Sequence, residues 1–490
     1  MSSPAPARPR PVHRAADLLA AYLPGSFYYS SARGVLLADG VHAHVRGTPG
    51  NRAAAAAEAL EAAVLAGVAN PVVVGAIGFR PDSGSSLIVP AVVRRAGVPD
   101  GDDGGRAGLA GGITGGDLAG AGGFSGTDQG DVAGEQGGVG SLGAQAGGSS
   151  GTDQGDVAGE QGGVGSRGAQ AGALPDPVGG ARGPSGGSQH AARSEDATAT
   201  RRDNRTTWTV VPRPAAEEYA ESVRRAVDLI GDGELRKVVL ARALDLVGEH
   251  GVSVRKLLRN LVVADPAAHA FAVDVSAPGD PAPRTLVGAS PELLVSRKGN
   301  VVTANPLAGS RRRTGDPERD ARAIAELRVS EKDLGEHALV AAQVAEVLGR
   351  YCTELEVPEG PDVMGTPTMW HLSTRITGRV GPGGPSSLEL AEALHPTPAV
   401  CGVPVELARD TIARLEPVDR GYYAGLVGWT DLAGDGEWVV TIRCAEVSDK
   451  TARLFAGAGV VAGSDPAAEL AETSAKFGTL LRALGAEEVA

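Results

Sequence analysis

A glycine-rich middle segment limits where this chain can build a packed core. Residues 97–203 consist mainly of Gly, Ala, Ser, Asp and Gln, and the stretch 125–147 recurs at 150–172 with one change, Leu142 to Arg167. A fixed repeat is typical of solenoid proteins, but two copies with so few apolar side chains are too little for a shared core. Glycine also loses more backbone entropy on ordering than any other residue. We therefore predict a low-complexity, disordered insertion that takes no part in chemistry.

The two flanking regions, 14–95 and 206–487, carry the periodic patterns of helices and strands. We expect helices over 51–66, 215–231, 320–350 and 466–484, and strands over 34–45, 71–77, 86–93, 237–246, 438–447 and 452–458. These elements do not follow the regular period of a doubly wound parallel sheet. Their order predicts an α+β fold with a mostly antiparallel sheet, and we expect the shorter region to be the N-terminal part of the same domain.

The bulk composition restricts the partners of the protein. The formal net charge of −13 argues against a nucleic-acid-binding protein, which needs a basic face. Cys352, Cys401 and Cys444 match no zinc or redox spacing, and such sparse cysteines are typical of a reducing compartment. The first 13 residues lack the apolar segment of a signal peptide, and no run of about eighteen apolar residues occurs. We therefore expect a cytoplasmic protein without a membrane partner.

Lys237 and Glu292 are the candidates for proton transfer. Lys237 begins an apolar strand, and Glu292 directly precedes the apolar run Leu293–Val295. Taken alone, each is more often a solvated strand end or an exposed turn carboxylate. In a shared dry cleft, burial would instead lower the pKa of the lysine and raise that of the glutamate, which suits a general base and a general acid. The residues alone leave both interpretations open.

Two pairs of acidic residues have the spacing of a shared helix face. Asp333 and Glu336 are three residues apart, and so are Glu469 and Glu472. Such pairs are usually ordinary solvated surfaces. Carboxylates from two helices can also converge on a hard cation, and Mg²⁺ takes one or two carboxylates together with waters and anionic substrate oxygens. Lys476, four residues after Glu472, fits a helix salt bridge as well as a substrate contact.

Arg443 and a pair of glycines are candidates for binding an anion. Arg443 lies in an alternating stretch that predicts a strand, and a substrate carboxylate would suit its planar guanidinium. Gly457 and Gly459 stand at the predicted end of a strand, where backbone N–H groups could approach an anion. This is no dinucleotide fingerprint, because no helix opens with GxGxxG after it. His337 and His371 make no metal-ligand spacing with each other.

Nine short segments that occur together and in order resemble the chorismate-utilising enzymes. They span about 208–485 and read KVVLAR, GASPELL, NPLAGSRRR, SEKDLGEH, HPTPAVCG, DRGYYAGLVGW, GEWVVTIRCAEV, LFAGAGVV and ELAETSAKF. A weaker match extends to VVVGAIGFRPDSGSSLIVP in the N-terminal region. No single segment is specific, but the ordered set is. The resemblance implies an α+β fold of two stacked, mostly antiparallel sheets flanked by helices, with a cleft that binds chorismate and Mg²⁺.

The resemblance also implies a role for each candidate residue. Lys237 matches the base that activates a water to attack C2 of chorismate, and Glu292 matches the acid that protonates the departing 4-hydroxyl. The implied metal ligands are Glu336 and Glu472, supported by Asp333 and Glu469. The residues implied to bind substrate are Gly309, His371, Ala399, Val400, Arg443, Gly457, Gly459 and Lys476.

Within the family, the residues resemble most those of the isochorismate synthases. Anthranilate synthases usually lack a lysine at the position of Lys237, and aminodeoxychorismate synthases carry a nucleophilic lysine where this chain has Ala308. The HPTPAVCG segment with Ala399 and Val400 also favours this group, whereas Val418 departs from the Phe of many relatives. We expect a monomeric isomerase without a glutamine amidotransferase subunit, which feeds siderophore or menaquinone biosynthesis. The alternatives are a salicylate synthase and a non-catalytic chorismate-binding protein.

Overall fold

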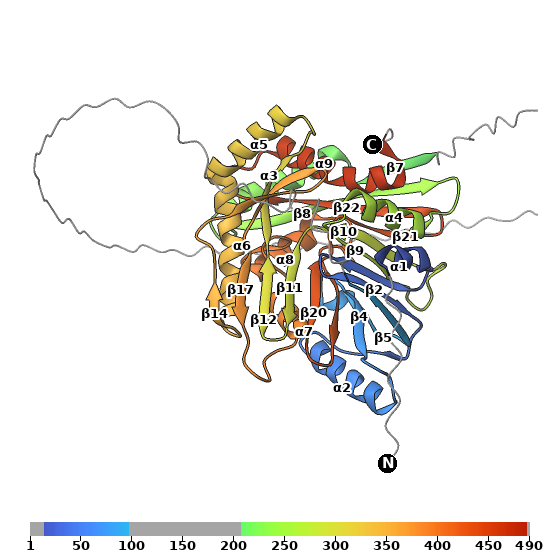
Figure 1. The fold of residues 1–490 in the computed structure, drawn as a ribbon. Coiled ribbons are helices and arrows are strands. Elements are labelled where there is room, and N and C mark those ends of the chain that lie inside the picture. Colours follow the sequence, from blue (N-terminus) through green and yellow to red (C-terminus); the bar gives the residue numbers. More distant parts are fainter. Residues whose placement is uncertain (1–13, 98–206, 488–490) are drawn as a thin grey trace, which may run out of the picture. The chain divides into compact units, whose positions relative to one another are not determined.

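The computed structural model describes residues 14–97 and 207–487, which belong to one compact unit. Their strands build two large sheets and one small sheet, and helices surround the sheets (Figure 1). Every strand pairing in these two ranges is antiparallel. The predicted α+β class is therefore confirmed. The insertion predicted over 97–203 lies outside the described residues except for Gly97.

The ten-stranded sheet contains the strand that begins with Lys237. Its strands, in spatial order, are β18 (Gly402–Val403), β8 (Lys237–Gly248), β22 (Thr451–Val460), β21 (Cys444–Ser448), β10 (Thr285–Ser290), β9 (His269–Asp274), β1 (Phe27–Ser31), β2 (Gly34–Asp39) and β6 (Val92–Ala96), while β7 (Trp208–Arg213) pairs with β8. The longest pairing joins β8 to β22, from Val247 opposite Thr451 to Val238 opposite Val460. Nearly every residue of β8 is buried, which agrees with its almost uninterrupted aliphatic sequence.

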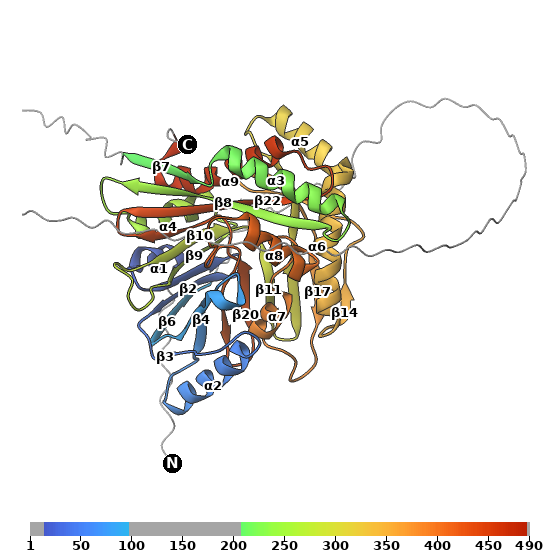
Figure 2. The same ribbon diagram turned by 180° about the vertical axis from the view of Figure 1, so that it is seen from behind.

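The nine-stranded sheet runs in a different direction beside the first (Figures 1 and 2). Its strands, in spatial order, are β14 (Thr353–Glu356), β17 (Ile376–Arg379), β12 (Val301–Asn305), β11 (Leu293–Lys298), β20 (Gly436–Val440), β19 (Leu426–Asp431), β4 (Val72–Ile77), β5 (Ser85–Val89) and β3 (Ala43–His44). The small sheet has the order β13 (Leu307–Arg312), β16 (Met369–Ser373) and β15 (Asp362–Gly365). Both large sheets thus combine strands that precede the insertion with strands that follow it.

Helices pack against the sheets on several sides (Figures 1 and 2). The ten-stranded sheet is contacted by α3 (Ala216–Gly231), α4 (Val254–Ala264) and α9 (Pro466–Leu484), and the nine-stranded sheet by α2 (Arg52–Leu65), α6 (Glu331–Gly349) and α7 (Ser387–Leu394). The other helices in the described ranges are α1 (Ala15–Ala21), α5 (Pro317–Val329), α8 (Val405–Leu415) and the short 3₁₀ helix Pro81–Ser83. None of these helices is long and apolar enough to cross a membrane.

The main apolar core combines residues of both large sheets. Phe271 and Leu286 of the ten-stranded sheet belong to the same buried cluster as Val295 and Trp438 of the nine-stranded sheet. A second cluster joins the ten-stranded sheet to α4 and α9 and includes Phe477. Burial of each such large side chain stabilises the fold by roughly 1.5–3 kcal/mol. These two clusters fix the sheet edges and helix ends that surround the site described below.

Two neighbouring crossovers carry the chain between the large sheets. β10 ends at Ser290 and β11 begins at Leu293, so Glu292 lies in the first crossover. β20 ends at Val440 and β21 begins at Cys444, so Arg443 lies in the second. Because β10 pairs with β21 and β11 pairs with β20, the two crossovers lie side by side. The single strand predicted over 438–447 is therefore wrong, and Arg443 has a left-handed φ of 51° that no extended strand allows.

Three other predicted elements are divided in the structure. The strand predicted over 34–45 becomes β2 and β3, and that over 86–93 becomes β5 and β6, with the members of each pair in different sheets. The helix predicted over 320–350 becomes α5 and α6, which meet at Ser330. The Ser330 hydroxyl accepts the N–H of Asp333 at 3.3 Å and thereby caps the second helix. Apolar periodicity continues across these breaks, so it does not reveal them.

Candidate active site

One pocket gathers most of the residues that the sequence singles out. Its walls are the two crossovers, parts of β13 and β22, the segment before β18, and the first turns of α6 and α9. The predicted residues that line it are Glu292, Gly309, Glu336, His371, Ala399, Val400, Arg443, Gly457, Gly459, Glu472 and Lys476. Lys237 contacts one of these lining residues, while Asp333 and Glu469 lie one helical turn before the lining carboxylates of their helices.

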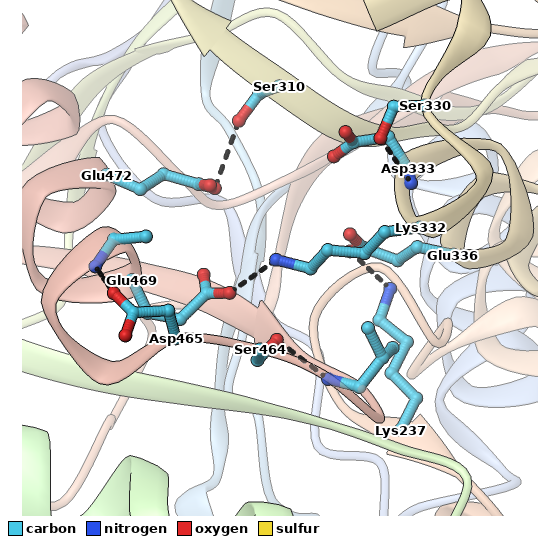
Figure 3. A network of polar contacts seen from close by, with 12 residues as sticks. Lys237, Ser310, Ser330, Lys332, Asp333, Glu336, Ser464, Asp465, Glu469 and Glu472 are labelled. Atoms are coloured by element: carbon cyan, nitrogen blue, oxygen red, sulfur yellow. Dashed lines mark hydrogen bonds and ion pairs between the residues drawn. The ribbon is translucent and has the colours of Figure 1, made fainter.

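Lys237 is buried beside a carboxylate, although it is the first residue of its strand. Its side chain is 0% exposed, and Nζ lies 2.9 Å from Oε1 of Glu336 (Figure 3). This is an ion pair without the alignment of a hydrogen bond, and Nζ has no hydrogen-bond partner in the described residues. A buried ammonium is tolerated only beside a counter-charge, which Glu336 supplies. Lys237 is therefore not the solvated strand end that the sequence alone allowed.

Glu292 is a buried carboxyl at the first crossover. It is 3% exposed, and its backbone N–H donates to Ser290 Oγ at 3.2 Å, so the turn around Pro291 is closed by a side chain. Burial raises the pKa of Glu292 to about 7, against the opposing effects of the Leu307 N–H and the positive charges of Lys237, Arg443 and Lys476. A carboxyl with this pKa is largely protonated just below neutrality and can donate a proton there.

Four carboxylates converge from the first two turns of α6 and α9, and each has its own cation. Besides the Lys237–Glu336 pair, the ion pairs are Lys332–Glu469 at 2.6 Å, Lys476–Glu472 at 2.5 Å and Arg311–Asp333 at 2.6 Å. Lys332 extends from α6 to α9, so one of these pairs links the two helices (Figure 3). The first turn of a helix favours negative charge, which suits the places of Asp333 and Glu469.

Two of these carboxylates differ in the direction of their pKa shifts. Burial alone would raise the pKa of Glu472, but the charge and hydrogen bond of Lys476 and the hydrogen bond from Ser310 outweigh it, so the net shift is downward. Burial and the nearby charge of Glu472 raise the pKa of Glu469. The ionised form is therefore favoured more strongly at Glu472 than at Glu469.

Arg443 and His371 form a contact in the pocket wall. An Nη2 hydrogen of Arg443 points to Nε2 of His371 at 3.3 Å, and both side chains are buried. Burial, followed by the charges of Arg443 and Lys476, lowers the pKa of His371 well below its usual value. His371 is therefore neutral, and its Nε2 accepts from Arg443. Arg443 has no ion-pair partner within the described ranges, so its positive charge remains available to an anion in the pocket.

Gly457 and Gly459 lie among the last four residues of β22, which agrees with their predicted position at the end of a strand. Beyond Leu454 this strand pairs with β8 but no longer with β21, so one of its edges is open beside the pocket. The Gly457 carbonyl accepts a hydrogen bond from Lys476 Nζ at 2.8 Å. An ideal Cβ on Gly459 would overlap Oε1 of Glu336, so glycine leaves the space that this carboxylate occupies.

Gly309 and the alanine before it bring β13 close to α6. Gly309 has a φ of 75°, and a Cβ there would press against the backbone oxygen of Asp333. His337 holds the same contact, because its ring nitrogens lie 3.2 Å from the Ala308 carbonyl and 2.7 Å from Thr374 Oγ1. Burial lowers the pKa of His337 to about 4. His337 is thus a neutral bridge in the core.

Several residues that shape the pocket were not among those predicted from the sequence. Tyr423 lines it and stacks on Phe455, with ring centroids 5.0 Å apart. Arg420 is 3% exposed and donates to the carbonyls of Val400 and Val239, each at 2.7 Å, which fixes two segments of the wall. Both lie in the DRGYYAGLVGW segment. The sequence signal for Arg420 is an arginine close to an apolar run. An arginine that becomes buried in such a run requires a partner.

The carboxylates of the two helices fit a magnesium ion. Glu336 and Glu472 come from different helices and both line the pocket. In the parts of the chain that the structure describes, no group of three or more His, Cys, Asp or Glu side chains forms a cage for a metal. Mg²⁺ requires no such cage, because it keeps several waters and is held by one or two carboxylates plus substrate oxygens. The donor set is thus the kind that magnesium uses.

Comparisons with known proteins agree on one family. Residues 187–485 match the family model described as chorismate binding enzyme. The isochorismate synthase DhbC of Bacillus subtilis is 53% identical over 284 residues, which are 58% of this chain and 71% of that protein. EntC, an isochorismate synthase of Escherichia coli, is 41% identical over 301 residues, which cover 61% and 75% of the two chains. The crystal structure of a putative 2,3-dihydroxybenzoate-specific isochorismate synthase, DhbC of Bacillus anthracis, superposes with a TM-score of 0.73 at 36% identity and covers 96% of this chain and all of that one.

Proposed function

The chain belongs to the chorismate binding enzyme family, and on this premise we propose that it is an isochorismate synthase, an isomerase that converts chorismate to isochorismate. The observation that carries the proposal is a pair of buried groups of opposite kind: Glu292, which lines the pocket with a pKa of about 7, and Lys237, whose amine contacts the pocket-lining Glu336. Water addition at one carbon and loss of hydroxyl from another require a base and an acid at separate places. The names of the similar proteins support the same reaction.

In this proposal Lys237 takes a proton from the water that attacks C2 of chorismate. The ring double bonds shift, and the 4-hydroxyl leaves as water with a proton from Glu292. One water enters and one leaves, so the product is an isomer of the substrate. In its ion pair with Glu336, Lys237 is an ammonium, so it must lose a proton to solvent before it can accept one from the attacking water. We propose that Glu336 would hold the metal ion, which would replace the ammonium as the counter-charge of this carboxylate and favour the neutral amine.

The pocket also has the cations that a dicarboxylate substrate requires. We propose that Arg443 and Lys476 bind the carboxylates of chorismate, with the open edge of β22 at Gly457 and Gly459 beside them. Arg443 suits this role because its fork donates two parallel hydrogen bonds to one carboxylate. His371 accepts from Arg443 and so orients the guanidinium. Fixing both carboxylates places C2 near the base, which makes the attack effectively unimolecular.

We propose that Mg²⁺ is the cofactor and that Glu336 and Glu472 are its protein ligands, with Asp333 and Glu469 close by. The ion would supply positive charge for a substrate carboxylate when bound. Each of these acids is now neutralised by a cation. A metal ion held by Glu472 would replace Lys476 as its counter-charge, and the ammonium would then be free to contact the substrate. The same carboxylates would thus pair with lysines when the metal is absent and bind the metal when it is present.

Gly459→Ala tests the place of Glu336. The added methyl group overlaps Oε1 of Glu336, so we expect the carboxylate to be displaced and the affinity for Mg²⁺ to fall by about 10–100-fold, the usual cost of disturbing a metal ligand's setting. Isothermal titration of the full chain with MgCl₂ measures this directly, without substrate. Gly335→Ala, at an exposed position of α6 where no atom approaches the added methyl, is the control for a glycine substitution nearby. Equal Mg²⁺ affinity in Gly459→Ala and the natural chain would contradict the assignment.

Product analysis tests the proposed reaction. We expect the purified chain to convert chorismate with Mg²⁺ into isochorismate as the main product, measured by liquid chromatography with coupled pyruvate detection. Salicylate in equal amount to pyruvate would instead identify a salicylate synthase. Complete absence of turnover, with chorismate still bound, would identify a binding protein. We propose that isochorismate supplies siderophore or menaquinone biosynthesis and that the protein acts as a cytoplasmic monomer without an amidotransferase subunit.

A further inference from the structure

A second pocket of about 420 Å³ collects buried nitrogens that have no partner. It is lined by the start of α2, the segment after β4, one side of α7 and Arg409 of α8, and it shares no lining residue with the candidate active site. Among the described residues, Nε of Arg52, Nδ1 of His395 and Nε of Arg409 are buried without a hydrogen-bond partner, and all three residues line this pocket. Natural proteins rarely leave such atoms unpaired, so their coincidence in one pocket points to a missing partner.

Arg52 already contacts one carboxylate in the wall of this pocket, that of Glu392. It is 5% exposed, and its Nη1 lies 3.3 Å from Oε1 of Glu392. The other oxygen of Glu392 accepts the N–H of Ala53 at 3.2 Å, at the N-terminus of α2. The Glu392 carboxylate therefore contacts Nη1 of Arg52 and the N-terminus of α2. Nε of Arg52 is left without an acceptor.

Among the described residues, Arg409 is the arginine of this pocket that forms no ion pair. Three arginines and two glutamates line it. Arg80 is paired with Asp82, Glu392 with Arg52, and Glu389 caps α7 by accepting the N–H of Ser386 at 2.6 Å. Arg409 makes no ion pair or hydrogen bond with any residue that the structure describes. A partly buried guanidinium without a counter-charge is costly, so an anion in this pocket would relieve it.

His395 adds a requirement for a hydrogen-bond donor. Its Nε2 lies 3.2 Å from the carbonyl of Phe79, so Nε2 carries the proton. Burial, together with the charges of Arg409 and Arg52, lowers the pKa of His395 to about 4, and Nδ1 is an acceptor near neutral pH. The missing partner must therefore offer an ionised oxygen to the arginines and a hydroxyl to the histidine. Ile77, Phe79 and Leu426 line the remaining space with apolar surface.

We propose that this pocket binds a small hydroxylated oxyanion, either a phosphate group or a hydroxycarboxylate. The unpaired nitrogens of Arg409, Arg52 and His395 are covered in the free protein, so the three side chains turn toward the ligand when it binds. The guanidinium groups then donate to the charged oxygens, and Nδ1 of His395 accepts from the ligand hydroxyl. The site lies outside the candidate active site, and it is adjacent in sequence to Ala399 and Val400 of that site's wall. It is a second ligand site of the chain, distinct from the one that would bind chorismate.

Calorimetric titration of the full chain at constant ionic strength tests the proposal, with chloride as the balancing salt. The probes are inorganic phosphate and 3-hydroxybenzoate. We expect saturable binding of at least one probe, weakened about tenfold or more in Arg409→Gln, since the substitution removes charge-assisted hydrogen bonds to the ligand. Arg409→Lys should bind with intermediate affinity. Arg414→Gln, on the same helix with its guanidinium bonded to Asp410 and Thr411, should bind like the natural chain.

The two probes distinguish the source of the oxyanion. Binding of phosphate alone assigns a phosphate group, and binding of 3-hydroxybenzoate alone assigns a hydroxycarboxylate. Chorismate turnover should keep its KM in Arg409→Gln, which separates this site from the active site. Absence of saturable binding of both probes up to ~10 mM, or equal binding by Arg409→Gln and the natural chain, would overturn the proposal.

Discussion

Lys237→Ala is expected to lower kcat by about 10²–10⁴-fold, the range for loss of a general base. Lys237 is fully buried, and its amine lies 2.9 Å from a carboxylate that lines the pocket. Removing the amine leaves the attacking water without a group that accepts its proton. The substrate carboxylates still meet Arg443 and Lys476, so we expect KM to change by much less than kcat. This split is what a proton-transfer role produces.

The matched control for this variant is Arg236→Ala. Arg236 is the preceding cation, but it is exposed and makes no contact with the pocket. We expect it to retain natural kcat and KM. Thermal melting of Lys237→Ala, together with Mg²⁺ and chorismate binding, checks that the fold and the pocket persist. A folded Lys237→Ala protein with natural turnover would remove Lys237 as the base.

Glu292→Gln should reduce kcat by a similar factor, about 10²–10⁴-fold, and remove one limb of the pH profile. The pKa of Glu292 is about 7, so the protonated form that acts as the acid is lost as the pH rises through 7. The natural enzyme should therefore lose kcat/KM above neutrality, while the residual activity of Glu292→Gln should lack this decline. Steady-state rates between pH 5.5 and 9 measure both effects. An unchanged alkaline limb in the variant would show that another group controls it.

Glu292→Gln should also change how the free energy of unfolding depends on pH. The sign of this change differs from that expected for a surface carboxylate. The folded pKa of about 7 exceeds the ordinary 4.5, so the stabilisation is complete below pH 4.5 and is lost as the pH rises through 7. The loss amounts to ~3 kcal/mol for a shift of this size in a buried group. Glu292→Gln removes it, so its free energy of unfolding should fall less than that of the natural chain between pH 5 and pH 8. The control for the pH profile of the rate is Glu437→Gln, which changes a buried glutamate outside the pocket. This variant should keep the alkaline decline of kcat/KM.

Local patterns in the sequence identify much of the candidate site. Strand β8 begins at Lys237, and Glu292 stands just before β11, as the apolar runs predict. The acidic pairs lie on α6 and α9 because a spacing of three residues is itself a helical property. The final helix also begins and ends at the predicted residues. Such features depend on neighbours within a few positions, so one sequence contains enough information for them.

Features that depend on distant partners were not predicted. The alternation of the stretch around Arg443 continues through a point where the chain changes sheets, and periodicity carries no sign of that change. The pairs Lys332–Glu469 and Arg311–Asp333 join residues 137 and 22 positions apart, which no spacing rule reaches. Arg420 pairs with Glu416 four residues before it, but the carbonyls of Val400 and Val239 that it also binds belong to distant segments, so its place in the pocket wall was missed. The fold decides these contacts, and the local sequence does not.

The placement of β6 and β7 determines how long the connection between them must be. β6 forms one end of the ten-stranded sheet and β7 pairs with β8 near the other, eight neighbouring steps away. At about 4.8 Å per step the connection spans roughly 38 Å, which about eleven extended residues can cover. The chain supplies 111 positions between Ala96 and Trp208 (208 − 96 − 1), and loop closure becomes costlier only with the logarithm of length. Sequence can therefore be gained or lost there, in steps as large as a whole repeat, without altering either sheet.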